Sequence, residues 1–114
     1  MKEEEEVKAK PSFFKVIEPK RFERTRVKLK EGKVLKVEIK YSGKIFIAQE
    51  HFFDVFAIGT TLEGTIRTIV QKLAFLYEIY VVVTSISELT EDAKQLRKLL
   101  EDYFEWKGYE EWEE

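Results

Sequence analysis

The sequence contains no cysteine and a single histidine, His51. Missing thiols exclude a disulfide framework, thiolate catalysis, and zinc or iron–sulfur sites held by cysteine. One imidazole is also too few for a metal site built from several histidines of the same chain. The sequence therefore predicts no metal ion and no cofactor, and it disfavours several classes of enzyme.

Side chains prone to chemical damage are scarce, because the chain has no asparagine and its only methionine is Met1. Lysine and glutamate are abundant instead, and charged residues make up 37% of the sequence. Few labile side chains together with many ion-pairing ones are typical of proteins from thermophiles. A thermophilic source is the prediction, and a chance bias in a mesophile is the alternative.

Long apolar runs are also absent, since the longest, residues 79–83, falls far short of the ~20 residues that span a bilayer. The charged first ten residues contain no targeting signal, so we expect a cytoplasmic protein without membrane association. A chain of 114 residues with 44% hydrophobic content is long enough for one compact domain and too short for two. We expect residues 11–108 to form this domain, between a disordered charged leader at 1–10 and an acidic tail at 109–114.

Alternating apolar and polar residues predict three antiparallel strands in the first half of the chain. These strands span residues 22–30, 33–41 and 44–49, with tight turns at Gly32 and Gly43. The short apolar segment 13–17 is either an edge strand or an arm packed on the core. Residues 50–59 fit either an extension of the third strand through a bulge or a short helical turn.

Apolar residues at three- and four-residue spacing predict two helices in the second half. The first covers residues 60–77, and Thr60 and Glu63 have the spacing of a capping box. The second begins at Ser87 or Thr90 and ends near Lys107 and Gly108, and its buried stripe includes Tyr103 and Phe104.

The segment between the helices, residues 78–85, is predicted to be a fourth strand within the core. Its central residues are almost wholly apolar and mostly β-branched, as in strands that are covered on both faces. Together these elements predict an α+β fold, with an antiparallel β-meander plus a further strand and two helices packed on one face.

Basic residues are concentrated in one part of the chain. Residues 20–44 contain ten Lys or Arg against three Glu. The outward basic residues of the first two predicted strands are Arg24, Arg26, Lys28, Lys30, Lys36 and Lys40. Such a face can bind phosphate or an acidic partner, or it can simply keep an open sheet soluble. It has no outward aromatic residue for stacking bases, which argues against base recognition in RNA but not against contact with a nucleic-acid backbone.

A second candidate site is the segment Glu50, His51, Phe52, Phe53 and Asp54. On a helical turn, His51 and Asp54 would share a face and could transfer protons, but two groups are too few to hold a metal ion. Alternatively, His51 packs on a neighbouring phenylalanine at the end of a loop. Neither a glycine-rich phosphate loop nor a nucleophile elbow is present, so we predict no catalytic residue and a partner-binding role for this segment.

Three segments follow one another in a specific order: a glycine turn and strand at 32–39, a second at 43–47, and His51-Phe52-Phe53. A helix, a strand and a last helix are then expected. This order resembles the C-terminal accessory domain of lipoate–protein ligases, which in some archaea looks like a separate small protein partnering the catalytic chain. That family has Gly-Asp before its two phenylalanines, where this chain has Gln49-Glu50-His51, and an acidic helix start where this chain has residues 54–58. The resemblance implies an accessory role in lipoate activation with no catalytic residue in this chain.

These observations predict a non-enzymatic accessory or interaction protein that acts through a protein partner. The alternative is a nucleic-acid-associated protein that uses the basic sheet face. A third hypothesis is an enzyme that uses Glu50, His51 and Asp54 in a cleft.

Overall fold

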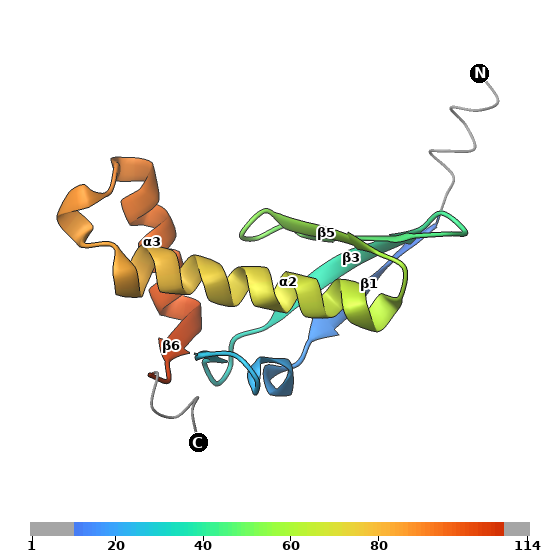
Figure 1. Cartoon of the computed structure of the whole chain (residues 1–114), viewed down its shortest axis with the longest axis horizontal. Helices are drawn as coiled ribbons and strands as arrows, with labels where there is room; N and C mark the ends of the chain where they lie inside the picture. The colour runs from blue at the N-terminus through green and yellow to red at the C-terminus, as the bar shows by residue number, and fades with distance from the viewer. Residues whose placement is uncertain (1–10, 109–114) are drawn as a thin grey trace.

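A four-stranded antiparallel sheet, a separate two-stranded sheet and two long helices make up the computed structural model (Figure 1). The structure describes residues 11–108, so the predicted leader at 1–10 and acidic tail at 109–114 lie outside the described residues. The elements in chain order are β1 (Ser12–Ile17), η1 (Pro19–Phe22), β2 (Val27–Leu29), β3 (Leu35–Tyr41), β4 (Phe46–Glu50), β5 (Val55–Gly59), α2 (Leu62–Tyr77), η2 (Glu78–Val83), η3 (Ile86–Glu88), α3 (Glu91–Tyr103) and β6 (Phe104–Trp106). The predicted α+β class is confirmed. Within residues 11–108, no helix is both long enough and apolar enough to cross a bilayer.

The larger sheet has the strand order β1-β3-β4-β5, with every neighbouring pair antiparallel. Strands β3, β4 and β5 form a meander, and β1 pairs with β3 so that Ile17 lies opposite Leu35. The segment 13–17 is therefore an edge strand, one of its two predicted forms. One face of this sheet is buried through Ile17, Leu35, Val37, Ile39, Ala48, Val55 and Ala57.

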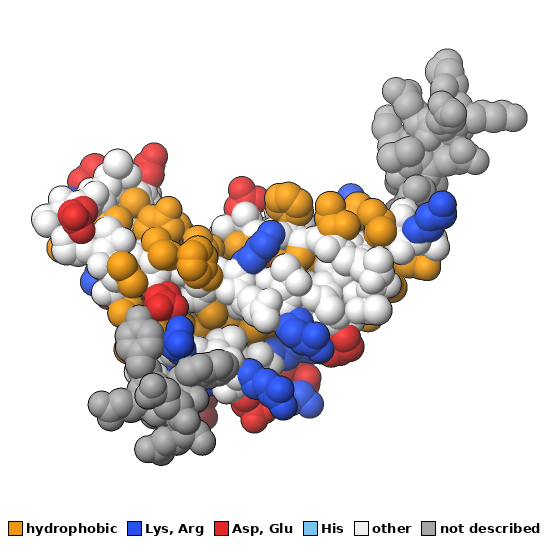
Figure 2. All heavy atoms as spheres, in the orientation of Figure 1, with side chains coloured by type: hydrophobic (Ala, Val, Ile, Leu, Met, Phe, Trp, Pro, Cys, Tyr) orange, Lys and Arg blue, Asp and Glu red, His pale blue; other side chains and the backbone are white. Residues whose placement is uncertain are grey.

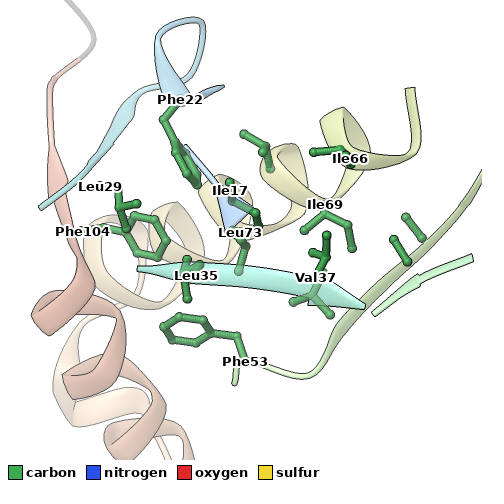
Figure 3. Close-up of a cluster of buried hydrophobic side chains, with 14 of the residues drawn as sticks. Ile17, Phe22, Leu29, Leu35, Val37, Phe53, Ile66, Ile69, Leu73 and Phe104 are labelled. Atoms are coloured by element: carbon green, nitrogen blue, oxygen red, sulfur yellow. The ribbon is translucent and has the colours of Figure 1, made fainter. Parts of the chain in front are cut away.

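Helix α2 supplies the apolar stripe that covers this inner face (Figure 3). Its predicted periodicity is confirmed, because Ile66, Ile69, Val70 and Leu73 are all buried. Burying side chains of this size contributes roughly 1.5–3 kcal/mol each. The helix thus holds the meander through contacts mainly with β4 and β5.

The start of α2 differs from the prediction by one residue. The N-cap is Thr61, not Thr60, and its Oγ1 accepts a hydrogen bond from the Gly64 N–H at 3.0 Å. Glu63 is consequently not part of a capping box. Its carboxylate instead accepts two hydrogen bonds from the Arg21 guanidinium, at 2.8 and 3.0 Å, which attach the η1 turn to the helix.

The predicted strand at 22–30 is largely wrong, since only β2 (Val27–Leu29) is extended. The Thr25 hydroxyl donates to the carbonyls of Phe22 and Val27, at 2.8 and 3.0 Å, and holds the preceding residues in turns. The predicted turn at Gly32 is present, with a φ of 84°. It does not make a β2–β3 hairpin, however, because β2 pairs with β6 from the other end of the chain.

Residues 50–59 adopt neither of the two predicted forms. The chain turns at residues 51–54 and returns as β5, antiparallel to β4. Asp54 has a positive φ of 59°, a conformation that Asp tolerates better than most residues. The Glu50 carboxylate closes the turn by accepting hydrogen bonds from the Phe52 and Phe53 N–H groups, at 2.9 and 2.8 Å.

The predicted fourth strand at 78–85 is wrong, because Glu78–Val83 continues α2 as the π-helical segment η2. A short apolar run has the same pattern in a strand and in a buried helix. Tyr80, Val81 and Val82 pack against the core from this helical backbone. The Arg97 guanidinium donates to the Tyr80 and Thr84 carbonyls, at 3.0 and 3.2 Å, and so attaches the end of η2 to α3.

Helix α3 begins after Thr90, one of its two predicted starts, and Thr90 Oγ1 accepts from the Ala93 N–H at 3.2 Å. The helix ends at Tyr103 rather than near residue 108, because Phe104–Trp106 forms β6. Phe104 is buried as predicted, but from a strand, and its ring lies 5.3 Å from that of Phe22 (Figure 3).

Candidate functional site

The predicted segment from Glu50 to Asp54 is the turn of the β4–β5 hairpin, and part of it is structural. Glu50 and Phe53 point inward and are buried. Phe52 is half exposed, and its ring lies 4.9 Å from that of Phe53 and 4.8 Å from that of Tyr103. These three aromatic rings attach the hairpin turn to the end of α3.

Glu50 is the one carboxylate of the segment that is enclosed by the protein. Burial raises the pKa of its carboxyl group, and the hydrogen bonds from the Phe53 and Phe52 N–H groups oppose that rise. The carboxylate accepts hydrogen bonds from two backbone N–H groups, and no ion pair to it is found within residues 11–108. Its position explains the shape of the turn, and Glu50 also lines a pocket of about 250 Å³ together with His51, Phe52 and Lys36.

We expect replacement of Glu50 by glutamine to change how stability depends on pH. Because the folded pKa is raised, the folded state keeps its proton at pH values where the unfolded chain, with a pKa of about 4.3, has lost it. The contribution of Glu50 to the free energy of unfolding therefore falls as pH rises from below the unfolded pKa through the raised folded pKa. Glutamine does not titrate, so the free energy of unfolding of the wild type should decline relative to that of Glu50→Gln across this pH window. Urea unfolding of both proteins between acidic and neutral pH measures the difference, and parallel profiles would contradict it.

His51 and Asp54 are held by different partners and do not share the face of a helical turn. His51 Nε2 lies 2.8 Å from Glu38 Oε1, and the Ser12 hydroxyl donates to the other oxygen of Glu38 at 2.9 Å. These two hydrogen bonds, that of His51 first, lower the pKa of the Glu38 carboxyl group. Asp54 accepts from the Gln49 side-chain amide at 3.0 Å. Among residues 11–108, no group of three or more acidic or histidine side chains is arranged to hold a metal ion.

The six predicted basic residues do not form a single face. Because β2 belongs to the smaller sheet, Lys28 is separated from β3, and Arg24 and Arg26 lie in the turns that precede β2. Lys30 Nζ donates to the Glu101 carbonyl at 2.6 Å, beside the end of α3. The remaining two, Lys36 and Lys40, lie on the outward side of β3.

A different basic surface lies between the η1 turn and α2. Lys20, Arg21, Arg24 and Arg67 line a groove of about 890 Å³ there, together with Glu23, Thr25, Val70 and Gln71. Arg21 is already occupied by its two hydrogen bonds to Glu63. Sequence alternation missed this surface because Arg67 comes from α2, Lys20 and Arg21 from η1, and Arg24 from the turn after η1.

The outward face of the large sheet is more apolar than predicted. Phe14 and Val16 of β1, Ile47 of β4, and Phe56 and Ile58 of β5 are all exposed on it. The predicted absence of outward aromatic residues concerned only the strands at 22–30 and 33–41. The aromatic residues on this face, Phe14 and Phe56, come from the neighbouring edge strands β1 and β5.

An apolar groove opens beside β5, at the notch between this strand and α3. Its volume is about 610 Å³, and it is lined by Phe53, Asp54, Val55, Phe56, Thr68, Gln71, Lys72, Phe75, Leu76 and Leu96. Figure 2 shows hydrophobic side chains on the walls of this notch and a basic side chain at its border. Lys72 Nζ donates to the Phe56 carbonyl at 2.7 Å and lies 5.1 Å from the centre of the Phe56 ring.

Most of the groove was missed from the sequence, although one signal was present. Phe75 lies outside the buried stripe of α2, and 62% of its surface is exposed. An aromatic residue out of phase with a helical stripe is a usable sign of a second contact surface. The contributions of Phe56 and Leu96 depend on how β5 and α3 are placed, and no local pattern reports that.

Comparisons of the chain with protein-family models, with curated proteins and with solved structures gave no match. A function for this protein must therefore be inferred from the geometry of these surfaces.

Proposed function

We propose that this protein is a non-enzymatic accessory protein that acts by binding a protein partner through the surface around β5. We call this the β5 surface, and it consists of Ile47, Phe56, Ile58, Phe75, Leu76 and Leu96. The observation that supports it is that apolar side chains line both sides of the same strand. Single exposed apolar residues are common on proteins, whereas contiguous ones mark interaction sites.

The β5 surface is continuous across two faces of the molecule. Ile47 and Ile58 are cross-strand neighbours on the outward face of the sheet, and Phe56 follows on the same side of β5. Phe56 also lines the groove that contains Phe75. More than half of the surface of Phe56, Ile58 and Phe75 is exposed, at 52%, 56% and 62%. A partner that covers these residues removes apolar area from water, at about 25 cal/mol per Å².

In its most specific form, the proposal is that the partner is a catalytic chain of the lipoate–protein ligase type. Two glycine turns, two strands and the Phe52-Phe53 pair keep the order on which that resemblance depends. One departure is that β5 follows the pair, where the family has a helix start. Under this proposal the chain contributes binding surface to the partner and no reacting group.

Partner capture with paired baits tests the proposal. Immobilised wild-type protein should retain a protein from a lysate of the source organism at high salt, because apolar contacts are not screened. Phe75→Asp should lose that protein, since a carboxylate in the groove opposes apolar burial. Val83→Asp is the matched control, because Val83 is equally exposed, at 63%, but does not line the groove. Equal retention by all three baits, or an empty wild-type eluate, would contradict the proposal.

A nucleic-acid-associated role is the second candidate, supported by the groove that Lys20, Arg21, Arg24 and Arg67 line. Binding of this type releases counterions and weakens steeply as salt rises. In the same capture experiment it would yield nuclease-sensitive material at low salt only. An Arg24→Glu/Arg67→Glu bait should lose that material, and the Phe75→Asp bait should keep it.

A further inference from the structure

Strand β5 forms one edge of the four-stranded sheet. Among the described residues, it pairs with β4 alone, through a register that runs from Glu50 opposite Val55 to Phe46 opposite Gly59. An edge strand presents a row of backbone N–H and C=O groups that another strand can use. The other edge strand, β1, is not bordered by the groove beside β5.

The backbone groups of β5 that face away from β4 can be assigned. The Phe56 carbonyl accepts a hydrogen bond from Lys72, a residue of α2, so this carbonyl points toward the free edge. In an antiparallel strand the N–H and C=O of one residue point the same way, and residues two apart share that direction. Phe56 and Ile58 therefore direct their N–H and C=O groups to the edge, while Val55, Ala57 and Gly59 direct theirs to β4.

Both sides of this edge are apolar, which distinguishes it from an edge that merely lies in water. On the outward face, Phe56 and Ile58 stand beside the position that an added strand would occupy. On the inner side, the groove offers Phe75, Leu76 and Leu96. Successive side chains of a strand point to opposite faces, so an added strand would direct alternate side chains toward Phe56 and Ile58 and the others toward the groove.

Lys72 adds a condition on the charge of the incoming strand. Its ammonium group donates a hydrogen bond to the Phe56 carbonyl at 2.7 Å. An N–H group of an added strand would need the same carbonyl as its acceptor. Once displaced, the ammonium group of this exposed lysine stands free at the border of the groove. A carboxylate on the incoming strand would complement its charge there.

We infer that the protein binds its partner by β-strand addition, in which an extended segment of the partner pairs with the free edge of β5. The segment is apolar at successive positions and carries one Asp or Glu that pairs with Lys72. This inference rests on the proposed function, and it adds the binding mode and the chemistry of the bound segment. Recognition of this kind derives affinity from main-chain hydrogen bonds and selectivity from the side-chain pockets beside them.

A displayed library of random dodecapeptides, panned on the wild-type protein, provides the probe. Enriched peptides should contain a short apolar run with an acidic residue, and one synthetic member is then titrated by amide NMR. We expect shifts at the N–H groups of Phe56 and Ile58 and at groove residues. Phe75→Asp should lower the affinity for this peptide by about tenfold or more, while Val83→Asp should leave it unchanged.

The edge itself is tested by Ile58→Pro against Ile58→Thr. Proline removes the outward N–H of residue 58, and it is tolerated on an edge strand where that N–H faces solvent. Threonine keeps the N–H and has a high strand propensity. Because one main-chain hydrogen bond is lost, the proline variant should bind the peptide with an affinity about two- to tenfold lower than that of the threonine variant. Equal affinities in two folded variants would overturn strand addition.

The role of Lys72 is tested by comparing the acidic peptide with its amide counterpart, in which Gln or Asn replaces the acid. The wild-type protein should prefer the acidic peptide about two- to fivefold, and Lys72→Met should abolish that preference. A preference that persists in Lys72→Met would refute the assigned charge pairing.

Other outcomes separate this inference from the proposed function. Partner capture that is lost in Phe75→Asp but unchanged in Ile58→Pro would keep the accessory function and overturn strand addition, as expected for a helix bound in the groove. A concentration-dependent dimer of the protein alone, broken by Ile58→Pro in sedimentation, would overturn the inference by identifying a second copy as the occupant. A library without enriched peptides would also overturn it.

Discussion

Replacement of Phe104 by alanine is expected to lower the free energy of unfolding by about 3–5 kcal/mol. Phe104 is almost fully buried, and its ring lies 5.3 Å from Phe22, 6.0 Å from Phe53 and 6.3 Å from Tyr77. These three rings come from the η1 turn, the β4–β5 turn and the end of α2, so the cavity would open where distant segments meet. A loss of this size is a large part of the 5–15 kcal/mol that typical domains possess.

Urea unfolding followed by far-UV circular dichroism measures the effect of Phe104→Ala. Phe75→Ala is the matched control, because it deletes the same side chain from an exposed position, 62% of which is in contact with solvent. The control should change the unfolding free energy by less than about 1 kcal/mol. Similar losses in the two variants would show that Phe104 does not join these segments as its contacts indicate.

Gly59→Ala is expected to destabilise the protein by about 1–3 kcal/mol, because it overpacks the junction between β5 and α2. A Cβ atom at this position would lie closer than 3.0 Å to Thr65 Oγ1, and 3.4 Å from Thr65 Cβ. Thr65 cannot easily move, since it is fully buried and its hydroxyl donates to the Thr61 carbonyl at 2.6 Å. The glycine is needed here for close approach and not for an unusual backbone angle.

A double-mutant cycle isolates this contact. Thr65→Ala removes the hydroxyl group that a new Cβ would meet most closely, while the Thr65 N–H keeps its hydrogen bond to the Thr61 carbonyl. Gly59→Ala should therefore cost clearly less in the Thr65→Ala background than in the wild type, with a coupling of about 0.5–3 kcal/mol. Thermal unfolding of the four proteins gives the four free energies. If the two single effects simply add, the steric explanation is wrong.

Local sequence patterns determined much of this protein. The stripe of Ile66, Ile69 and Leu73 predicts α2, because a period near 3.6 residues follows from helix geometry alone. Thr90 marks the start of α3 for a similar reason, since its hydroxyl satisfies a backbone N–H at a helix start. Alternation in β3 reports which side chains face a core, and the α+β class follows from combining these elements.

Only the tertiary structure decided which segments pair. β2 and β6 pair although they are far apart in the chain, and alternation in β2 cannot specify its partner edge. The apolar run 78–85 fits a strand or a buried helix equally well, and continuation of the backbone from Tyr77 made it helical. In the same way, Asp54 with its positive φ allowed a tight turn that produced β5.

The candidate site likewise depends partly on local sequence and partly on tertiary structure. The Glu50–Asp54 segment was recognisable from its composition, but the turn places Glu50, His51 and Phe52 around one small pocket and directs Phe53 and Asp54 to the groove beside β5. The β5 surface combines Phe56, Phe75 and Leu96 from a strand and two helices, so no stretch of sequence contains it. A local pattern reports the face that a side chain occupies on its own element. Which faces meet to form a surface is decided by packing between elements that are distant in the chain.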